Sequence, residues 1–478
     1  MNVYEKLGDP VAAAVFIATL LLPIAVGLLA MRRTKNQSDF FLGGRAMGRF
    51  TVALSAVASG RSSWLVLGVS GMAWTMGASA VWAIAGYTAA EALQFVTIGR
   101  RLRTASAASE SLTLLDYFAA RFADRHHWLR ITGALIIGIF ITAYVAAQFN
   151  AGAKTLTAAL DIPFHLTLPA CGLLILVYMV LGGFVAVAWN DVVRAIIMIV
   201  GLIVLPVVTL VQAGGLDQLA ALLPAAHLSF SAVGAGAVIG FLGIGLGSPG
   251  QPHVVVRYMS IRDERQLVSA ALIGTFWNIA LGLGAVAIGL VGRALVPNIT
   301  GLPHSDPEMI YLVLSARCFD PVWYGLLVGG IFAAILSTAD SQLLVVASTV
   351  VRDIREKMMG GEHVDERARL RLSRTVVVLS GLLAMGLALL ADDLVFWLVL
   401  FAWGGLGASL GPALIASLYW RRTSRAGVLA GMIAGTSVTI VWKLLLKDAT
   451  GVYELIPAFA AASLCIVVFS LWRPDPDL

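Results

Sequence analysis

Apolar runs long enough to cross a bilayer recur from one end of the chain to the other. A membrane-spanning helix needs about 20 mostly apolar residues, and runs of this length alternate here with short polar loops. The pattern therefore predicts an all-α polytopic membrane protein with about 13 transmembrane helices. The expected helices are 10–31, 50–77, 78–98, 128–158, 164–187, 191–213, 229–256, 266–295, 321–350, 372–391, 394–419, 426–446 and 454–472.

Two of these runs are interrupted near the middle. In 50–77, the segment 58–63 (ASGRSS) puts a glycine, small polar residues and the charge of Arg61 between apolar flanks. An intramembrane arginine costs at least about 2.5–3.5 kcal/mol and normally faces a protein cavity. In 229–256, the segment 245–252 (GLGSPGQP) contains three glycines and two prolines and cannot form a continuous helix. We expect both segments to be non-helical and to face each other across a central binding cavity.

The spacing of the two interruptions suggests an internal repeat. The interrupted runs lie five spans apart and cross the membrane in opposite directions, and paired interruptions of this kind indicate an inverted-repeat transporter. We therefore predict a single membrane transporter domain, 1–478, with a five-plus-five core. Within it we expect a peripheral first helix at 10–31, a first repeat at 50–213, a second repeat at 229–419 and two peripheral helices at 426–472.

Composition excludes several classes of protein. With 59% hydrophobic and 13% charged residues, the chain is neither a soluble enzyme nor a disordered protein. Its net charge of +6 does not indicate nucleic-acid binding, because the basic residues lie in alternate short loops. By the positive-inside rule they place the N-terminus outside and the C-terminus in the cytoplasm, at the cell inner (plasma) membrane. The expected cytoplasmic loops carry Arg32, Arg33, Lys35, Arg45, Arg100, Arg101, Arg103, Arg121, Arg125, Arg130, Arg257, Arg262, Arg265, Arg421, Arg422 and Arg425, with a further cluster in 352–374.

Five motifs follow one another along the chain. They are Ser63-Trp64-Leu65, the segment 112–118 (LTLLDYF), Gly182-Gly183-Phe184 with Ala186, Trp189 and Asp191, the segment 245–253, and Leu336-Ser337-Thr338 with Ser341-Gln342-Leu343-Leu344. Their order and spacing, from about residue 40 to 440, resemble the solute:sodium symporter family, and most closely its sodium/proline symporter branch.

The resemblance implies a sodium site between the first interrupted helix and the ninth span. Its ligands would be the carbonyls of Ala58, Arg61 and Ala334 and the hydroxyls of Ser337 and Thr338. A hard cation prefers oxygen ligands, and a helix break frees carbonyls that would otherwise be hydrogen-bonded. The alternative for the two hydroxyls is that they bond back to carbonyls of their own helix.

The resemblance also implies a substrate cavity lined by Trp64, Tyr144, Ser248 and Gln251. Trp64 and Tyr144 match aromatic positions of the proline branch, whereas Ile244 and Ser248 stand where aromatics are usual. Without these two aromatic rings, we expect the pocket to be larger than that of the proline branch and to have a different shape. Half-helix N-termini present free N–H groups and a positive dipole end, so we expect a small carboxylate-bearing metabolite that is amino-acid-like and proline-related.

Two positions depart from the proline branch, which has an aspartate at Gly60 and an uncharged residue at Arg61. If Arg61 points into the ion site, its guanidinium replaces sodium, and transport is sodium-independent or proton-coupled. If it points away, its carbonyl still serves the ion and sodium coupling survives, which is the alternative we favour. Both cations cannot share one small site, because their repulsion would be several kcal/mol. Candidate partners for Arg61 are Glu91, Asp191 and Asp340.

Each of these acids also has another interpretation. Asp191 follows Trp189 and Asn190 at a predicted helix junction, so it is either the family acid linked to sodium dependence or the N-cap of the next helix. Asp340 lies roughly opposite the Ser337 and Thr338 hydroxyls at about 100° per residue, and it could pair with Arg61, line the cytoplasmic exit or relay protons. Glu91 is expected near the cytoplasmic interface, paired with a loop arginine.

Other classes of function fit less well. The sequence has no P-loop, catalytic triad or metal cluster, so we do not expect an enzyme. Membrane domains of this family also occur fused to histidine kinases, but we expect such a sensor to continue into a soluble signalling domain, and this chain stops at Leu478. The expected partners are a small-molecule substrate and membrane lipid, without nucleic acid or an obligate protein partner.

Overall fold

The computed structural model describes residues 3–31, 37–179, 184–360, 366–391 and 394–475. Arg32, Arg33, Lys35, Gly182 and Gly183, to which the sequence analysis gave roles, lie outside the described residues. The described chain is helical, with one isolated bridge between Met47 and Ile261, and this confirms the all-α prediction.

The helices are numbered in chain order, with η marking short 3₁₀ or π segments. They are η1 Val3–Gly8, α1 Pro10–Met31, α2 Gln37–Leu42, η2 Gly43–Arg45, α3 Arg49–Ser63, η3 Trp64–Val69, α4 Ser70–Met76, η4 Gly77–Ala80, α5 Val81–Gln94, η5 Phe95–Gly99, α6 Arg100–Ala108, α7 Leu114–Arg121, α8 Trp128–Leu160, α9 Phe164–Met179, α10 Phe184–Ile199, η6 Val200–Val204, α11 Leu205–Gln212, α12 Gly215–Leu222, α13 Ala225–Leu228, α14 Ala235–Gly243, η7 Ile244–Gly250, α15 Pro252–Ser260, α16 Gln266–Leu295, η8 Ile299–Gly301, η9 Pro303–Ser305, η10 Pro307–Met309, α17 Ile310–Cys318, α18 Pro321–Ser348, η11 Thr349–Glu356, α19 Glu366–Ala388, α20 Val395–Tyr419, α21 Arg425–Val441, η12 Trp442–Leu446, α22 Lys447–Thr450 and α23 Leu455–Trp472.

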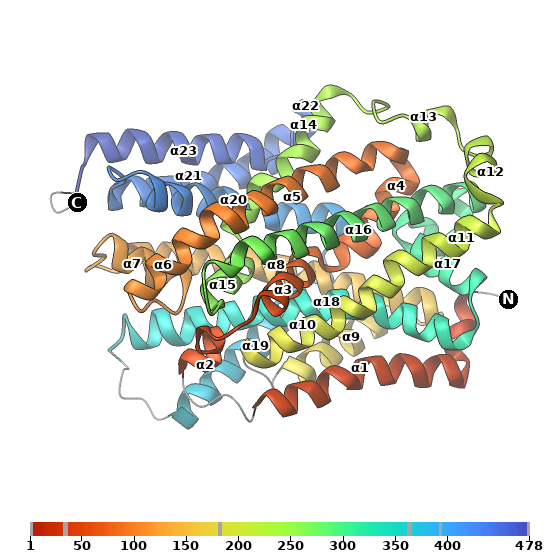
Figure 1. Cartoon of the computed structure of the whole chain (residues 1–478), viewed down its shortest axis with the longest axis horizontal. Helices are drawn as coiled ribbons and strands as arrows, with labels where there is room; N and C mark the ends of the chain where they lie inside the picture. The colour runs from red at the N-terminus through yellow and green to blue at the C-terminus, as the bar shows by residue number, and fades with distance from the viewer. Residues whose placement is uncertain (1–2, 32–36, 180–183, 361–365, 392–393, 476–478) are drawn as a thin grey trace.

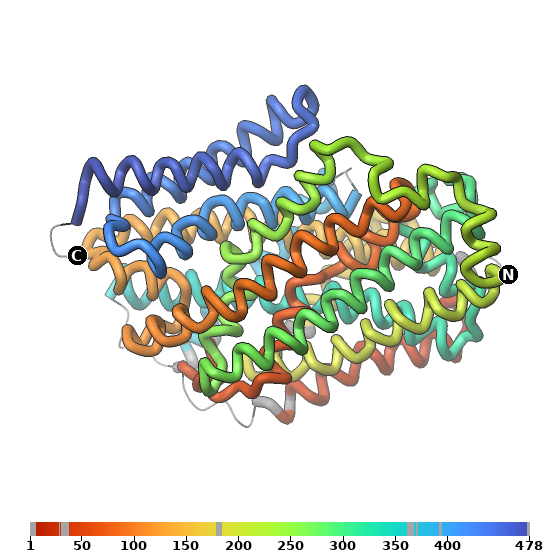
Figure 2. The backbone as a smooth tube through the Cα atoms, turned by 45° about the horizontal axis from the view of Figure 1, so that its top comes forward, coloured from red at the N-terminus to blue at the C-terminus, as the bar shows by residue number. Residues whose placement is uncertain are grey.

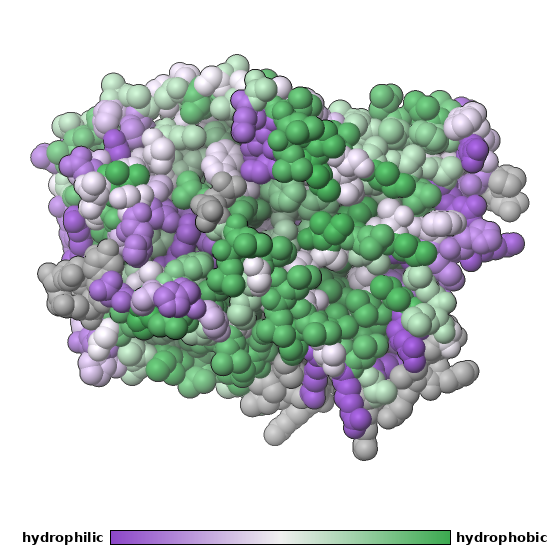
Figure 3. Space-filling model, turned by 180° about the vertical axis from the view of Figure 1, so that it is seen from behind, coloured by the Kyte–Doolittle hydropathy of each residue, from purple (hydrophilic) through white to green (hydrophobic). Residues whose placement is uncertain are grey.

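Most long helices run along the long axis of the molecule (Figure 1). In the described part of the chain, ten helical stretches are long and apolar enough to cross a membrane, and two shorter apolar helices accompany them. Hydrophobic residues cover the middle of the face in Figure 3, and hydrophilic residues gather toward both ends of the long axis. A multi-pass membrane protein follows from this arrangement. The number of about 13 spans and the inverted repeat stay predictions.

The longest helical stretch, Arg49–Ala108, contains a chain reversal. At Gly77 the backbone takes φ 69° and ψ −148°, and the chain turns back through η4 into α5, so that α4 and α5 both pack against α16 (Figure 1). Two features require glycine at this position: φ is positive, and a Cβ would lie 2.4 Å from the Cα of His227. The reversal lies where the sequence analysis divided 50–77 from 78–98.

Local capping explains where several helices begin. The Thr113 hydroxyl accepts the Asp116 N–H at 2.9 Å and starts α7, and Asp320 accepts the Trp323 N–H at 3.1 Å and starts α18. Ser424 does the same for α21 by accepting the Gly427 N–H at 3.1 Å. Each cap satisfies one of the free N–H groups at a helix N-terminus.

The predicted helix junction before Asp191 is wrong. Residues 184–212 form one helical stretch through α10, η6 and α11, and Asp191 lies inside it rather than at an N-cap. Asparagine and aspartate indicate a helix start because their side chains can cap free N–H groups. Here the Asp191 carboxylate is bound instead by side chains of other helices, described below, and the helix continues.

The outer helices surround a core built around α3 and α18. α1 packs against α18 and α10, while α21 and α23 pack against each other and against α20. The two termini lie at opposite ends of the long axis, as the tube in Figure 2 shows. The division of the chain into peripheral helices at 10–31 and 426–472 and two repeats between them stays a prediction.

Candidate functional site

The first interruption is a break at a single residue. Within α3 only Ser62 leaves helical geometry, with φ 50° and ψ −168°, so the break is narrower than the expected 58–63. The Ser62 hydroxyl accepts the Trp64 N–H at 3.1 Å and lies 3.4 Å from the Tyr144 hydroxyl. Residues 52–63 are all buried, and the break therefore faces protein rather than lipid.

The second interruption is longer, but within 245–252 the expectation of non-helical backbone is met at Gln251 alone, because 245–250 are 3₁₀-helical and Pro252 begins an α-helix. It consists of the 3₁₀ segment η7, an extended Gln251 with φ −92° and ψ 101°, and α15, which begins at Pro252. η7 packs closely against α20: a Cβ at Gly250 would lie 2.5 Å from the Leu406 carbonyl oxygen. Glycine is required there by the close approach of two backbones.

The proposed ion ligands meet where α3 crosses α18. The Ser337 hydroxyl lies 3.0 Å from the Ala58 carbonyl oxygen and 3.0 Å from the Ala334 carbonyl oxygen. Thr338 donates to the Ser59 carbonyl at 3.0 Å. Ser337 thus bonds both within its own helix and across to α3, whereas Thr338 bonds across. These neutral oxygens are the donor set that a hard monovalent cation needs.

The fifth expected ligand, the Arg61 carbonyl, lies at the break itself. It accepts the N–H of Trp64, which also donates to the Ser62 hydroxyl. The structure therefore brings the oxygens of Ala58, Ala334, Ser337 and Thr338 to one helix contact, with the Arg61 carbonyl one turn along α3. Their role as ion ligands stays a prediction.

The Arg61 side chain points toward α5 and α16. Its Nε donates to Asn278 Oδ1 at 2.9 Å, its Nη2 pairs with Glu91, and its guanidinium carbon lies 3.6 Å from the Tyr87 ring centroid. Asn278 also donates to Glu91 Oε2 at 2.7 Å. We refer to Arg61, Glu91, Asn278 and Tyr87 as the Arg61 cluster. Of the three candidate partners, Glu91 is the one that Arg61 meets.

The expectation that Glu91 pairs with a loop arginine near the interface is wrong. Only 1% of Glu91 is exposed. The helix does not end near residue 98 but continues through η5 and α6 to Ala108, so Glu91 lies deep inside the bundle. A carboxylate at that depth requires a buried counter-charge, which Arg61 supplies.

The other two acids belong to a separate group of charges. Asp191 Oδ2 accepts from the Ser55 hydroxyl at 2.6 Å, the Ser59 hydroxyl at 3.0 Å and Arg257 Nη2 at 3.0 Å. Asp340 Oδ2 lies 2.5 Å from Arg194 Nη1. Asp191, Asp340, Arg194 and Arg257 form what we call the inner cluster.

Sequence reasoning missed the two arginines of the inner cluster. Arg257 was placed in a cytoplasmic loop, but it lies on α15 and is 1% exposed. Arg194 was not considered, although it is a charge within an apolar run three residues after Asp191. Charged residues inside an apolar run need a partner of opposite charge, so the acids and arginines of these runs could have been paired from the sequence. Asn278 carried no comparable signal.

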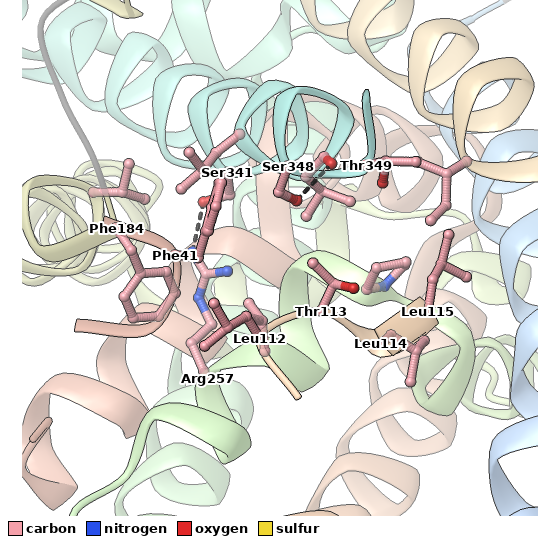
Figure 4. Close-up of a pocket in the computed structure, with 16 residues that line it drawn as sticks. Phe41, Leu112, Thr113, Leu114, Leu115, Phe184, Arg257, Ser341, Ser348 and Thr349 are labelled. Carbon is pink, nitrogen blue, oxygen red and sulfur yellow. Dashed lines mark hydrogen bonds between the residues drawn. The ribbon is translucent and has the colours of Figure 1, made fainter. Parts of the chain in front are cut away.

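A cavity opens beside the inner cluster (Figure 4). Arg257 and Ser341 both line this cavity, and Arg257 Nη2 donates to the Ser341 hydroxyl at 2.5 Å. Thr113 of the segment 112–118 lines the same cavity, and its hydroxyl donates to Asp353 at 3.1 Å. The cavity therefore connects the segment 112–118 with the polar groups next to the α3–α18 contact.

Asp116 anchors this end of the protein. Its carboxylate lies 2.8 Å from an Arg130 nitrogen and 3.2 Å from Arg352 Nε. Burial raises the pKa of Asp116, but the two guanidiniums outweigh burial and hold the pKa below its ordinary value. The segment 112–118 is thus tied to α8 and η11 by charge.

A small cavity adjoins the first break. Its walls combine Arg61 with aromatic and aliphatic side chains, and it is lined by Gly60, Arg61, Trp64, Tyr144, Ile244, Val399, Leu400 and Trp403. Its volume is about 10 Å³, which admits about one water molecule, so the cavity is too small for an organic substrate in this conformation. The Trp64 ring stacks on Phe396 at 5.6 Å between centroids and meets Tyr87 edge-on at 5.7 Å.

The four expected substrate residues divide into two pairs. Trp64 and Tyr144 line the small cavity. Gln251 instead donates to the carbonyls of Gly247 at 3.1 Å and Trp403 at 2.9 Å, which ties η7 to α20. Ser248 is buried in η7, and its carbonyl accepts from Gln94 Nε2 at 3.3 Å. The contribution of all four residues to substrate binding stays a prediction.

Comparison with known proteins places this architecture in a family. The sodium:solute symporter family matches residues 40–435. The sodium/proline symporter of Escherichia coli strain K12 is 36% identical over 462 residues, covering 95% of this chain and 91% of the relative. The osmoregulated proline transporter of Bacillus subtilis strain 168 is 35% identical over 467 residues, covering 96% and 94%.

Solved structures show the same fold. A Na⁺-coupled sialic acid symporter, in a substrate-bound outward-open state, matches with a TM-score of 0.82 at 17% identity over 98% of this chain and 99% of that one. A nucleobase-cation symporter in a closed conformation matches with a TM-score of 0.59 at 14% identity over 92% and 95%. With the family match over most of its length, the chain belongs to the sodium:solute symporter family, a family of secondary transporters.

Proposed function

We propose that this protein is a sodium-coupled symporter of a small, carboxylate-bearing, proline-related metabolite. Relatives named as proline transporters and about one-third identical over nearly the whole chain support the substrate class. The observation that carries the sodium coupling is the direction of Arg61. Its guanidinium is held by Glu91, Asn278 and Tyr87, so it is not a fixed cation among the oxygens at the α3–α18 contact.

Electrostatics support this assignment. Arg61 is paired with Glu91, and Arg257, the arginine bonded to Ser59 and Ser341 beside the contact, is paired with Asp191. Each guanidinium is therefore balanced by a carboxylate, and the field at the neutral oxygen cluster is not dominated by an unpaired positive charge. A sodium ion can then occupy the cluster without the repulsion of several kcal/mol that an unpaired guanidinium would cause.

The position of the oxygens explains how an ion could be coupled to a conformational change. The Ala58 carbonyl belongs to α3, and the Ala334 carbonyl and Ser337 hydroxyl belong to α18. An ion bound to all three favours the arrangement in which the two helices are in contact. The ion therefore shifts the equilibrium by its differential affinity for that arrangement.

We also propose that the N-terminus is outside and the C-terminus is cytoplasmic. Basic residues of η2 and α6 gather at one end of the structure: Arg45 donates to Ser106 and Ser111, Arg103 to the Ile261 carbonyl and Arg101 to the Leu418 carbonyl. The positive-inside rule assigns this end to the cytoplasm. A reporter enzyme active only in the cytoplasm, fused after residue 478, should be active, and an inactive but expressed fusion would contradict the orientation.

Uptake into proteoliposomes tests the coupling. At fixed pH, labelled proline and related carboxylates are supplied with an inward sodium gradient or with choline in place of sodium. We expect uptake to require sodium, and we expect Ser337→Ala to raise the sodium concentration needed for half-maximal uptake. Sodium-independent uptake by the wild type would overturn the proposal. If Arg61 acts in place of sodium, the wild type ignores sodium and Arg61→Met gains a sodium response.

A further inference from the structure

Arg61 has hydrogen-bonding capacity that its protein partners do not use. A guanidinium carries five N–H donors. Nε donates to Asn278 and Nη2 pairs with Glu91, but the contact of Nη1 is the Gly60 carbonyl at 3.4 Å, beyond the ordinary N–H···O range of about 2.7–3.2 Å. Arg61 is 1% exposed, so these donors are also shielded from bulk water. Buried donors without close acceptors are costly unless a ligand satisfies them.

Arg61 is one of the residues that line the small cavity. Arg61 is the charged residue among its lining side chains, and the other walls are formed by Trp64, Tyr144, Trp403 and aliphatic residues. A guanidinium recognises a planar carboxylate through paired, charge-assisted hydrogen bonds. The walls therefore suit a carboxylate attached to a compact apolar body.

Charge balance narrows the ligand further. Glu91 already neutralises Arg61, so a bound carboxylate alone would leave one uncompensated negative charge in a buried site. Glu91 Oε1 has no hydrogen-bond partner among the described residues. It lies directly behind Gly60, a lining residue, because a Cβ on Gly60 would be 3.4 Å from it. A cationic group on the ligand, close to Gly60, would restore neutrality.

We propose that the Arg61 guanidinium binds the substrate carboxylate and that Glu91 balances the substrate's cationic group. The transported class is then small zwitterions with a compact apolar body, and not simple anions or amines. This inference rests on the proposed symport function and names the residues that select its substrate. Because the Arg61 carbonyl is also an expected ion ligand, one residue would contact both cargoes and link their binding.

The first experiment compares ligand charge at constant shape. Purified wild-type protein in saturating sodium is tested by thermal shift and radioligand competition with L-proline, L-pipecolate and glycine betaine as zwitterions. L-Prolinamide serves as the cation, and tetrahydrofuran-2-carboxylate, with a ring oxygen in place of the ring nitrogen, serves as the anion. We expect binding of at least one zwitterion and at least tenfold weaker binding of the cation and the anion. Equal affinity for L-proline and L-prolinamide, or no response to any carboxylate, overturns the inference.

The second experiment separates ligand binding from simple neutralisation of Glu91. Arg61→Gln should weaken zwitterion binding about 10–150-fold, the range for a lost charge-assisted hydrogen bond. The double variant Arg61→Gln/Glu91→Gln removes the buried charge imbalance. If Arg61 contacts the carboxylate, the double variant stays weak and discriminates less between L-proline and L-prolinamide. Recovery of wild-type affinity by the double variant would overturn the inference.

A matched control breaks another buried ion pair. Arg130 and Asp353 form a buried ion pair next to the segment 112–118, away from the small cavity. Arg130→Gln/Asp353→Asn should keep the discrimination between L-proline and L-prolinamide, even if the protein is less stable. Loss of discrimination in this control would contradict a specific role for Arg61. A wild type that binds zwitterions equally in sodium and choline contradicts the proposed coupling alone, and so the two failures are distinguishable.

Discussion

The two interrupted helices break in different ways. α3 bends at Ser62 alone, a serine with positive φ held by its bond to the Trp64 N–H, and no proline takes part. The second helix is interrupted over η7 and Gln251, with Pro249 and Pro252 and with glycines pressed against α20. The first break adjoins the small cavity. The second break contacts a wall of that cavity, because Gln251 donates to the carbonyl of the lining residue Trp403 as well as to that of Gly247.

The two breaks show that irregular backbone can serve two different purposes, the placement of side chains and the close packing of backbones. A one-residue break preserves helix on both sides and places Arg61 and Trp64 with little freedom. A glycine-rich break lets two backbones approach, which fixes the position of a whole segment. We infer that changes to the cavity-lining Trp64 beside the first break alter ligand binding, whereas changes to the glycines of the second break alter folding.

The largest effect is expected at the second break. Gly250→Ala would put a Cβ 2.5 Å from the Leu406 carbonyl oxygen, and neither backbone can move without breaking the packing of η7 on α20. We expect a loss of about 3 kcal/mol or more of stability, at the upper end of overpacking effects. Yield of monodisperse protein and thermal unfolding measure it. A variant with wild-type yield and melting temperature would remove the contrast between the breaks.

The matching change at the first break should affect uptake rather than folding. Trp64→Ala removes the ring that stacks on Phe396 and lines the small cavity. We expect uptake to fall more than tenfold, equivalent to about 1.4 kcal/mol or more of binding, while the amount of folded protein changes less than twofold. Normal transport by this variant would mean that the substrate binds elsewhere.

A smaller effect should come from the strained residue. Ser62 has φ 50° and ψ −168°, a conformation that costs non-glycine residues about 1–3 kcal/mol. Ser62→Val should lower stability by about 2 kcal/mol, because a β-branched side chain tolerates this backbone least and loses the bond to Trp64. Ser62→Gly should stay within about 1 kcal/mol of wild type, because relief of strain offsets the lost bond. Thermal unfolding of both variants tests the order, and equal losses would contradict strain at Ser62.

The smallest effect on folding is expected at Gly60. It lies within helical backbone, and a Cβ would make an ordinary contact of 3.4 Å with Glu91 Oε1. Gly60→Ala should leave the free energy of unfolding unchanged or raise it by up to about 1 kcal/mol through helix propensity. Gly60→Ala is therefore the stability control for Gly250→Ala. A large loss of stability in Gly60→Ala would show that both breaks depend on glycine in the same way.

Much of the fold could be predicted from the apolar pattern. The expected helices 10–31 and 266–295 agree with α1 and α16, because a long apolar run between charged loops leaves few alternative ends. The junction before Asp191 was wrong because polarity in the sequence does not distinguish a cap from a side chain with partners on other helices. The position of the second break followed from proline and glycine, while Ser62 has no such signature.

The candidate site could be predicted only in outline. The sequence named three possible partners for Arg61, but the choice of Glu91 depends on how α3, α5 and α16 pack, which no local pattern contains. Asn278, which holds both charges of that pair, was invisible for the same reason. Arg257 was misplaced because a cation near the end of an apolar run resembles a topology signal until its burial is known.

The buried charges also have a consequence for electrical behaviour. Three arginines and three carboxylates in the Arg61 cluster and the inner cluster cancel: Arg61, Arg194, Arg257, Glu91, Asp191 and Asp340. Moving one elementary charge through a membrane potential of 100 mV changes the free energy by about 2.3 kcal/mol. Rearranging these six groups as a unit moves no net charge. In a carrier that moves a zwitterion together with sodium across the bilayer, the voltage would therefore act on the step of the loaded carrier, and the empty carrier could return at a rate independent of voltage.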